Sequence, residues 1–543
     1  MLRPLVTRVF AAALAALLLS VPAASAQDLP LELPRDASAA TTDADPGSWL
    51  VGGVPGKRTA AIAKRFGAKH FGLRGTGGYK VARKHARAFA RALRKRGLLV
   101  YASANHYVEP LQAVPDDPLS GPPNNWRAVV ASPMLTPPPV TAESPLIALV
   151  DSAADTTHPE WTGANVATLP GTPVTNAHGT ATLAVAAAPR NGIGILGVWP
   201  GARALNVPLK EVPGSNGKIT CDASGDAIAA AVEAGASVIN MSYGSPSRCA
   251  AEWVQLYFAV ARGIIPVAAA GNEFERGNPL EFPASLPHVV TVAATTRAGE
   301  SARFSNANDA IDLSAPGVGI LTAVPPAFDA DGAPDGYQVL DGTSFSAPMV
   351  SAAMAWVRAA RPDLPADRVV QAVRLSATDV GTKGWDPLTG FGLLNVGAAL
   401  SVPDDKLPIH DPQEPNDNLV WVNGRAFGKP SRAVWSGGKP KRVNALLDKQ
   451  EDPVDVYRIV IPAGRTAKVS VIPRFGDPSL EVFSSSAVSV NDEPITRSRR
   501  SGSKKTERVS VTNRGTKKRS YYVVVRPQGN ARNQSREYTL RVG

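Results

Sequence analysis

After its first 26 residues, the sequence contains no apolar run of the ~20 residues that a membrane-spanning helix needs. The marked apolar run, Phe10–Leu19, is shorter; it follows Arg3 and Arg8 and precedes the small residues Ala24-Ser25-Ala26. This order is typical of a secretory signal peptide. We therefore expect a secreted protein, extracellular or periplasmic, with no membrane partner. A retained membrane anchor at residues 1–26 is the alternative.

Cysteine is scarce, and neither internal repeats nor coiled-coil heptads occur. The two cysteines, Cys221 and Cys249, lie 28 residues apart and allow a single disulfide bond. We expect that bond because an exported protein folds in an oxidising compartment. In the loop-entropy account it would contribute about 3 to 4 kcal/mol to stability. Two free buried thiols are the alternative.

Acidic residues are absent from 57–96, whose fourteen Lys or Arg more than account for the formal net charge of +12. Outside this block, 44 basic residues face 46 acidic ones. A second basic run, Arg497–Arg519, contains no aromatic residue, whereas nucleic-acid sites interleave basic and aromatic side chains. We therefore expect no nucleic-acid partner. The block 57–96 is interpreted either as a solvated face or as an electrostatic docking surface.

Strand and helix patterns divide the chain after the signal peptide. Within the segment 27–112, residues 47–112 predict a small α+β unit, and a Pro-rich extended connection follows over 114–141. Residues 113–402 alternate short apolar strands with helices, which predicts an α/β fold with a parallel sheet covered on both faces. A polar linker, 403–418, leads to residues 419–543, whose alternating pattern predicts an all-β sandwich.

Four polar side chains of the α/β region stand where catalytic groups gather. Asp151 ends one predicted strand and Asn272 follows another, while His178 and Ser344 each stand at the start of a predicted helix. Functional loops of open α/β sheets collect at the carboxyl ends of the strands. Each residue alone is weak evidence, because Asp, Asn and Ser are also common cap and turn residues. Their joint occurrence in this order is the signal.

The four side chains suit acyl transfer. A serine hydroxyl needs a neighbouring base, a neutral imidazole serves as that base, and a carboxylate fixes the imidazole tautomer. Negative charge then develops on the carbonyl oxygen under attack. The Asn272 side chain and the Ser344 backbone N–H, at a helix N-terminus, are suited to donate to it. Asp151, His178 and Ser344 are therefore predicted to form a catalytic triad.

The segments DSAADTTHPE, HGT, AAAGN and GTSFSAP carry these residues, and they resemble the motifs of the subtilisin-like serine peptidases. The order Asp, His, Ser is also that of the family. The resemblance covers about 146–399 and implies a subtilisin-like fold, with Asn272 completing the oxyanion hole. It also implies substrate binding by the segment that contains Ser242, Tyr243 and Gly244. The small residues Ala270 and Gly271 are expected to line an open pocket for a large apolar side chain.

Three places depart from the family pattern beside the reacting groups. Ala153 stands where Gly is usual, Ala181-Thr182 follow HGT where His and Val are usual, and Phe345 replaces the common Met. None of these changes removes a reacting group. The first two are expected to alter the fit around the Asp–His pair.

The flanking regions also resemble parts of secreted peptidases. Residues 27–112 resemble a propeptide that assists folding and inhibits the enzyme until it is cleaved, with the cleavage site expected between Asn105 and Trp126. The linker and residues 419–543 resemble an appended β-sandwich. This resemblance implies a self-processed zymogen that acts on polypeptide substrates, with its own propeptide as inhibitor. We expect a monomer without a cofactor; calcium is common in the family, but no acidic loop has calcium-ligand spacing.

Three alternatives remain. An α/β-hydrolase esterase would need G-x-S-x-G and a His after the nucleophile, but Ser344 lies in GTSFS and the later His410 falls in the linker. His158 is an alternative base, although the HPE segment resembles a structural part of the Asp motif. A catalytically inactive binding protein with a subtilisin fold is the third, and it would usually have lost a triad residue.

Overall fold

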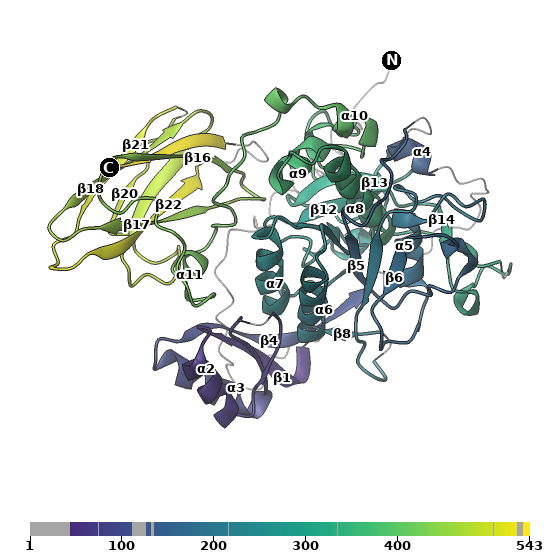
Figure 1. Cartoon of the computed structure of the whole chain (residues 1–543), viewed down its shortest axis with the longest axis horizontal. Helices are drawn as coiled ribbons and strands as arrows, with labels where there is room; N and C mark the ends of the chain where they lie inside the picture. Colours follow the sequence, from purple (N-terminus) through teal and green to yellow (C-terminus); the bar gives the residue numbers. More distant parts are fainter. Residues whose placement is uncertain are drawn as a thin grey trace, which may run out of the picture.

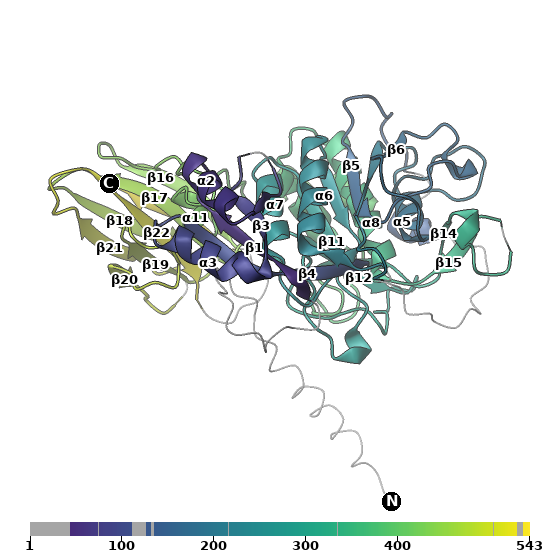
Figure 2. The same ribbon diagram turned by 90° about the horizontal axis from the view of Figure 1, so that it is seen from below.

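The computed structural model describes residues 44–73, 75–110, 126–131, 135–215, 217–333, 335–502, 504–528 and 536–543. The expected signal peptide lies outside the described residues. Three bodies lie side by side (Figures 1 and 2). We call them the N-terminal unit (44–110), the central unit (135–401) and the C-terminal unit (441–543). None of the described helices combines the length and the apolar content needed to cross a bilayer.

The N-terminal unit is α+β, as its sequence predicts. Its strands run antiparallel within a six-stranded sheet that extends into the central unit. The basic side chains of its two helices are exposed, apart from the half-buried Arg83, while their apolar residues, such as Phe89 and Leu93, are buried. Its elements are β1 (Ala44–Gly53), α2 (Lys57–Arg65), β2 (Lys69–His70), β3 (Gly78–Ala82), α3 (Arg83–Arg94) and β4 (Leu99–Pro110).

A seven-stranded parallel sheet forms the middle of the central unit, with the strand order β13-β12-β11-β9-β5-β7-β6. Most of these strands are buried along their whole length, because helices cover both faces of the sheet; this explains their continuous apolar runs. The strands are β5 (Ile147–Asp151), β6 (Val166–Thr168), β7 (Ala204–Pro208), β9 (Val238–Met241), β11 (Ile265–Ala269), β12 (Val290–Thr295) and β13 (Ile311–Pro316).

Two apolar cores hold the helices against the sheet. α5 (His178–Ala187), α8 (Thr343–Ala360) and α9 (Ala366–Leu375) share one core, and α6 (Cys221–Glu233) and α7 (Ala250–Val260) share the other. The predicted parallel sheet with helices on both faces is therefore confirmed. The shorter elements are η1 (Pro159–Trp161), β8 (Ile219–Thr220), β10 (Tyr243–Gly244), η2 (Phe274–Arg276), β14 (Ile320–Ala323), η3 (Pro326–Phe328), β15 (Tyr337–Leu340), α10 (Val396–Ser401) and η4 (Asp404–Lys406).

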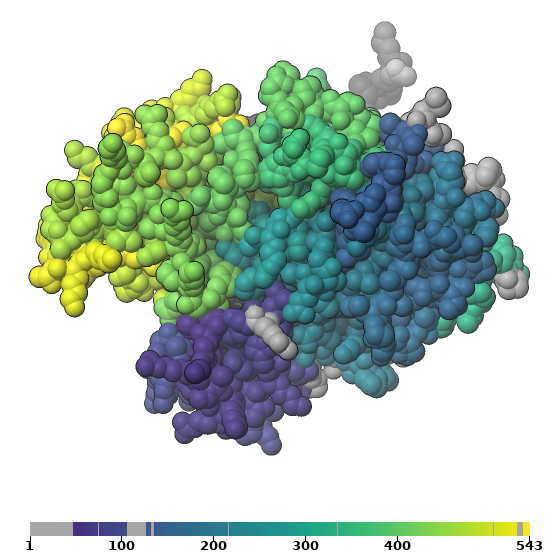
Figure 3. Space-filling view, in the orientation of Figure 1, coloured from purple at the N-terminus to yellow at the C-terminus, as the bar shows by residue number. Residues whose placement is uncertain are grey.

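The C-terminal unit is the predicted β-sandwich. Two four-stranded antiparallel sheets, β16-β23-β18-β21 and β17-β22-β19-β20, enclose a common apolar core. Their strands are β16 (Lys441–Leu447), β17 (Asp455–Ile461), β18 (Thr466–Pro473), β19 (Pro478–Phe483), β20 (Thr496–Ser498), β21 (Glu507–Thr512), β22 (Arg519–Pro527) and β23 (Arg536–Val542). In the space-filling view, this unit meets the central unit along a broad front, and the N-terminal unit lies below both (Figure 3).

Two stretches differ from the expected pattern. The sandwich was expected from residue 419, but helix α11 (Leu419–Val422) stands there, capped by the Asn418 side chain and buried on all sides. The connection at 114–141 was expected to be extended, but it contains helix α4 (Trp126–Val130). Trp126 is buried, and its indole N–H donates to the carbonyl of Leu321 at 3.1 Å, so tertiary contacts fix this helix.

Candidate active site

The predicted Asp–His pair forms at the carboxyl edge of the sheet. Asp151 is the last residue of β5, and His178 is the first residue of α5. The Nδ1 atom of His178 lies 2.6 Å from Oδ1 of Asp151, which is 2 % exposed. A carboxylate at Nδ1 favours the tautomer with its proton there, so Nε2 is left as the basic nitrogen.

Further donors hold the Asp151 carboxylate. The backbone N–H of Ser152 donates to Oδ1 at 2.7 Å, and the hydroxyl of Thr182 donates to Oδ2 at 3.0 Å. Thr182 is fully buried on α5, one turn after His178. One short helix therefore supplies both the imidazole and a donor to its partner carboxylate. The sequence analysis noted Thr182 only as a departure from the family pattern. The hydroxyl that replaces the usual valine side chain was the feature from which a hydrogen bond to Asp151 could have been predicted.

Close backbone contact explains the glycine after His178. A Cβ atom on Gly179 would lie 2.0 Å from the carbonyl oxygen of Ser152, so helix α5 can approach the end of β5 only with glycine here. The Ser152 hydroxyl accepts from the Gly179 N–H at 2.9 Å and donates to Asn176. The Asn176 side chain in turn accepts from the N–H of His178 at 2.9 Å. These bonds fix the imidazole relative to the carboxylate.

Ser344 lies at the N-terminus of the 18-residue helix α8, where its backbone N–H points out of the first turn. It is fully buried in the complete chain. Its hydroxyl donates to the carbonyl of Ser242 at 3.3 Å, and the Ser242 hydroxyl donates to the carbonyl of Ser344 at 2.9 Å. The next residue, Phe345, has its ring centroid 6.1 Å from that of His178. The start of α8 therefore lies beside both the predicted base and the predicted substrate-binding segment.

The orientation of Asn272 is set by its neighbour in α8. Its Oδ1 atom accepts from the backbone N–H of Thr343 at 3.0 Å and from the Thr343 hydroxyl at 2.9 Å. The same hydroxyl accepts from the N–H of Gly271 at 3.2 Å. Because the amide oxygen is held on this side, the NH₂ group faces the other way and is the group suited to donate to a substrate. Thr343 is a positioning residue that the sequence analysis did not single out.

Strand β10, the predicted substrate-binding segment, is occupied in this structure. It pairs antiparallel with the end of β4, in the register Tyr243 with Pro110 and Gly244 with Glu109. The same strand β4 also pairs with β8, which lies just before α6. The last strand of the N-terminal unit thus makes the backbone ladder that an extended peptide substrate would make.

Polar contacts seat the N-terminal unit on α6. Lys80 forms a 2.7 Å ion pair with Asp222, and the Asn105 side chain donates to the same carboxylate at 2.8 Å. The N–H of Gly72 donates to Asp226 at 2.8 Å. Lys80 belongs to the basic block, whereas the basic residues of α2 and α3 are mostly exposed, so the block is mainly a solvated face with a docking contact at Lys80.

Cys221 and Cys249 form a disulfide bond with a Cα–Cα distance of 5.6 Å. Cys221 begins α6, and Cys249 is the residue before α7. Apolar residues of the N-terminal unit, including Leu50 and Tyr101, pack in the same core as both cysteines. The bond therefore joins the two helices on which the N-terminal unit rests.

The remaining histidines of the sequence analysis lie in other settings. His158 is 4 % exposed, and its Nδ1 accepts from the N–H of Glu160 at 3.1 Å, so it caps η1. Burial lowers the pKa of His158, as expected for a neutral structural histidine. His410 pairs with Asp367 at 2.9 Å in the linker. The alternative base is therefore engaged in holding the loop after Asp151.

This combination of fold and site defines a class of protein. A parallel α/β sheet with an Asp at a strand end, a His and a Ser at helix starts, and the order Asp, His, Ser characterises the subtilisin-like serine peptidases. In agreement, residues 142–392 match the Subtilase family. The chain is also 31 % identical to subtilisin of Bacillus pumilus over 277 residues, covering 50 % of this chain and 96 % of that protein. The chain belongs to the subtilase family.

A second relative, fervidolysin of Fervidobacterium pennivorans, is 32 % identical over 314 residues, which are 53 % of this chain and 44 % of that protein. Its crystal structure, described as a keratinolytic enzyme related to subtilisin, matches with a TM-score of 0.57 at 20 % identity. That match covers 94 % of this chain and 87 % of the other. The shared fold therefore extends beyond the central unit.

Proposed function

We propose that the chain is a secreted serine endopeptidase, made as a self-processed zymogen, with Asp151, His178 and Ser344 as its triad. The observation that carries this proposal is the meeting of the Asp151–His178 pair with the start of α8 at one edge of the sheet. The family membership of the chain supports the same assignment.

In the proposed reaction, His178 removes the proton from the Ser344 hydroxyl as its oxygen attacks the scissile carbonyl carbon. The Asp151 carboxylate stabilises the imidazolium that forms. His178 then protonates the leaving amine, which departs with the carboxyl-terminal fragment and leaves an acyl-enzyme. Water, deprotonated by the same imidazole, hydrolyses the ester and restores Ser344.

Negative charge on the substrate oxygen would be met by two donors. The Ser344 N–H lies at the positive end of α8, and the Asn272 amide is turned toward the site because Thr343 holds its oxygen. Loss of one such donor costs about 100- to 1,000-fold in kcat in comparable sites. The backbone of Ser242–Gly244, with Ala270 and Gly271, would hold the substrate chain beside these groups.

The zymogen proposal rests on β4. Its end pairs with Tyr243 and Gly244, so the uncleaved chain fills its own substrate-binding strand, and Ser344 is fully buried in this state. Cleavage after β4 would free the strand once the N-terminal unit dissociates. The 27–112 segment is accordingly proposed as the inhibitory propeptide, and the processed protein as a monomer that acts on polypeptides.

The test compares the full-length chain with Ser344→Ala. We expect the wild type to shed its N-terminal unit and then to hydrolyse casein, and the variant to do neither. A serine-directed fluorophosphonate should label the processed wild type alone. If both proteins are processed equally and neither cleaves casein nor takes the label, the proposal is refuted in favour of an inactive binding protein.

A further inference from the structure

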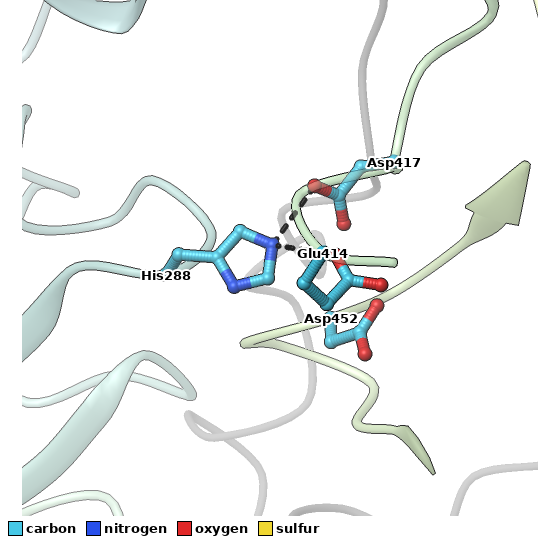
Figure 4. Close-up of side chains that lie close together, drawn as sticks. All are labelled: His288, Glu414, Asp417 and Asp452. Atoms are coloured by element: carbon cyan, nitrogen blue, oxygen red, sulfur yellow. Dashed lines mark hydrogen bonds and ion pairs between the residues drawn. The ribbon is translucent and has the colours of Figure 1, made fainter. Parts of the chain in front are cut away.

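Carboxylates from the linker and from the C-terminal unit gather beside His288 of the central unit. We call Asp411, Glu414, Asp417, Asp452 and Asp455 the interdomain carboxylate cluster. Ligand atoms of Glu414, Asp417 and Asp452 lie with one of His288 within 4.8 Å of one another. Those of Asp411, Glu414 and Asp455 do the same, so Glu414 belongs to both groups. Figure 4 shows His288, from the central unit, facing the first group.

Several oxygens of this cluster are buried without a donor. Asp452 is 7 % exposed and Asp455 is fully buried. Among the described residues, Oδ1 of Asp452, Oδ1 of Asp455 and Oδ1 of Asp417 have no hydrogen-bond partner. A buried carboxylate oxygen that lacks a donor is costly, so a folded protein normally supplies a cation or a proton.

The cations nearby do not balance the cluster. His288 donates to Asp417 at 2.9 Å and lies 3.4 Å from Glu414. The neighbouring Arg374 is engaged with Asp312 at 2.9 Å. One histidine side chain therefore faces the five acidic side chains of the cluster.

Other groups hold the carboxylates in position. The Asn416 side chain donates to Glu414 at 2.8 Å, and the N–H of Val456 donates to the Asn416 oxygen at 2.6 Å. The N–H of Gln413 donates to Asp411 at 2.9 Å, and the Tyr538 hydroxyl donates to the second oxygen of Asp455. Asp411 and Glu414 accept at both oxygens, since the N–H of Leu446 donates to Asp411 at 3.2 Å and that of Asn416 to Glu414 at 2.9 Å, whereas Asp455 keeps one oxygen without a donor. Such outer contacts are typical of preorganised metal ligands.

The cluster also has access to solvent. A cavity of about 310 Å³ lies between the central and C-terminal units and is lined by His288, Asp411, Glu414 and Asp452, among other residues. An ion can therefore reach the ligands without unfolding either unit. Ligands from two separated segments, 411–417 and 452–455, explain why no single acidic loop of the sequence showed calcium spacing.

We propose that the interdomain carboxylate cluster binds Ca²⁺ and that the ion fastens the C-terminal unit to the central unit. The donor set favours a hard cation, because carboxylate oxygens dominate and Ca²⁺ takes six to eight oxygen ligands in flexible geometry. His288 remains in the outer layer, where its hydrogen bond to Asp417 ties the central unit to the site. Neither the ion nor its binding depends on the peptidase activity proposed above.

The test uses the full-length Ser344→Ala protein, which removes self-digestion as a variable. After treatment with a chelator, Ca²⁺ is titrated by calorimetry, and Tb³⁺ luminescence is excited through the nearby tyrosines, such as Tyr538. The double variant Asp452→Asn/Asp455→Asn in the same background removes two ligands. The matched control, Asp405→Asn/Glu493→Gln, removes two exposed acids of the linker and the C-terminal unit.

We expect the ligand variant to bind one Ca²⁺ fewer than the parent and its control, and to lose at least tenfold in sensitised Tb³⁺ emission. At Ca²⁺ a hundredfold above Kd, the parent and control should melt about 5 °C or more above their metal-free forms, by mass action on the folded state. In the ligand variant, the increase in melting temperature on adding Ca²⁺ should be smaller by the part that this site contributes. Asp417→Asn serves as a milder second variant if the double variant does not fold.

Equal Ca²⁺ stoichiometry and equal melting shifts in parent and ligand variant would overturn the proposal. So would binding of Zn²⁺ or Mn²⁺ at the cluster with no binding of Ca²⁺ at millimolar concentration. Because all these proteins carry Ser344→Ala, none of these outcomes bears on catalysis, and failure of the calcium site is distinguishable from failure of the proposed peptidase.

Discussion

Thr182→Val should impair the reaction without removing any reacting group. The hydroxyl of Thr182 donates to Oδ2 of Asp151 at 3.0 Å, and valine has nearly the same shape without the donor. A hydrogen bond to a charged acceptor contributes about 1.5 to 3 kcal/mol, and a buried acceptor that loses its donor costs about 1 to 3 kcal/mol. This hydrogen bond also helps to keep the Asp151 carboxylate oriented toward His178.

If about 1 to 2 kcal/mol of that energy is lost in the transition state, kcat should fall by about 5- to 30-fold. KM should change little, because Thr182 lies behind the triad and does not face the substrate strand. The carboxylate also loses a donor that favours its charged form, so it should attract the imidazolium proton more strongly. The acidic limb of the pH–rate profile is therefore expected to move to higher pH.

The assay follows hydrolysis of a chromogenic peptide by the processed enzymes. Thr180→Val is the matched control, since Thr180 is fully buried on the same helix but its hydroxyl accepts from the N–H of Asp155. Thr182→Ser should restore most of kcat. The reasoning is refuted if Thr182→Val retains wild-type kcat, or if Thr180→Val shows the same loss and the same shift of the acidic limb.

Further predictions concern maturation, the disulfide and the substrate pocket. Processing should create a new N-terminus between 111 and 126, because β4 ends at Pro110 and Trp126 is packed in the central core; N-terminal sequencing that finds it elsewhere contradicts the β4 register. Cys221→Ser/Cys249→Ser should lose about 2 to 5 kcal/mol of unfolding free energy, measured in denaturant with and without reductant, and reductant should no longer matter. Glu281 is 4 % exposed, and its Cγ lies 2.7 Å from where a Cβ on Gly271 would be. Glu281→Gln should therefore lower the cleavage rate after Lys and Arg relative to Leu and Phe in peptide libraries, and an unchanged ratio would separate this carboxylate from specificity.

Much of the central unit was predictable because its signals are local. The apolar run 146–150 coincides with strand β5, which is buried on both faces. Such a strand is apolar at successive positions, so a short continuous apolar run predicts it directly. The triad residues follow from short motifs in a fixed order. In the structure, Asp151 and His178 lie 2.6 Å apart. The sequence motifs predicted this pair but could not give the distance.

What the sequence concealed depends on contacts between distant segments. Helix α6 begins at Cys221, although its first turns contain Asp222 and Gly225, which are poor helix formers on their own. Tertiary contacts offset this weakness. Gly225 lets α7 approach so closely that a Cβ there would lie 2.7 Å from that of Ala251, and the N–H of Asp222 donates to Asn105 at 3.1 Å.

The helix pair α6 and α7 contacts both the N-terminal unit and the segment that leads into the C-terminal unit. The N-terminal unit rests on α6, while Trp421 of α11 stacks on Tyr257 of α7 with centroids 3.8 Å apart. Arg425, just after α11, donates to the carbonyl of Gly97 at 3.2 Å, so the segment that leads into the C-terminal unit touches the N-terminal unit. Release of the N-terminal unit would remove this contact but leave the Trp421 stack and the interdomain carboxylate cluster. The segment that leads into the C-terminal unit is thus held at two places. Maturation would expose part of the first, because Trp421 packs in the same core as Leu50 and Tyr101 of the N-terminal unit, and removal of calcium would weaken the second.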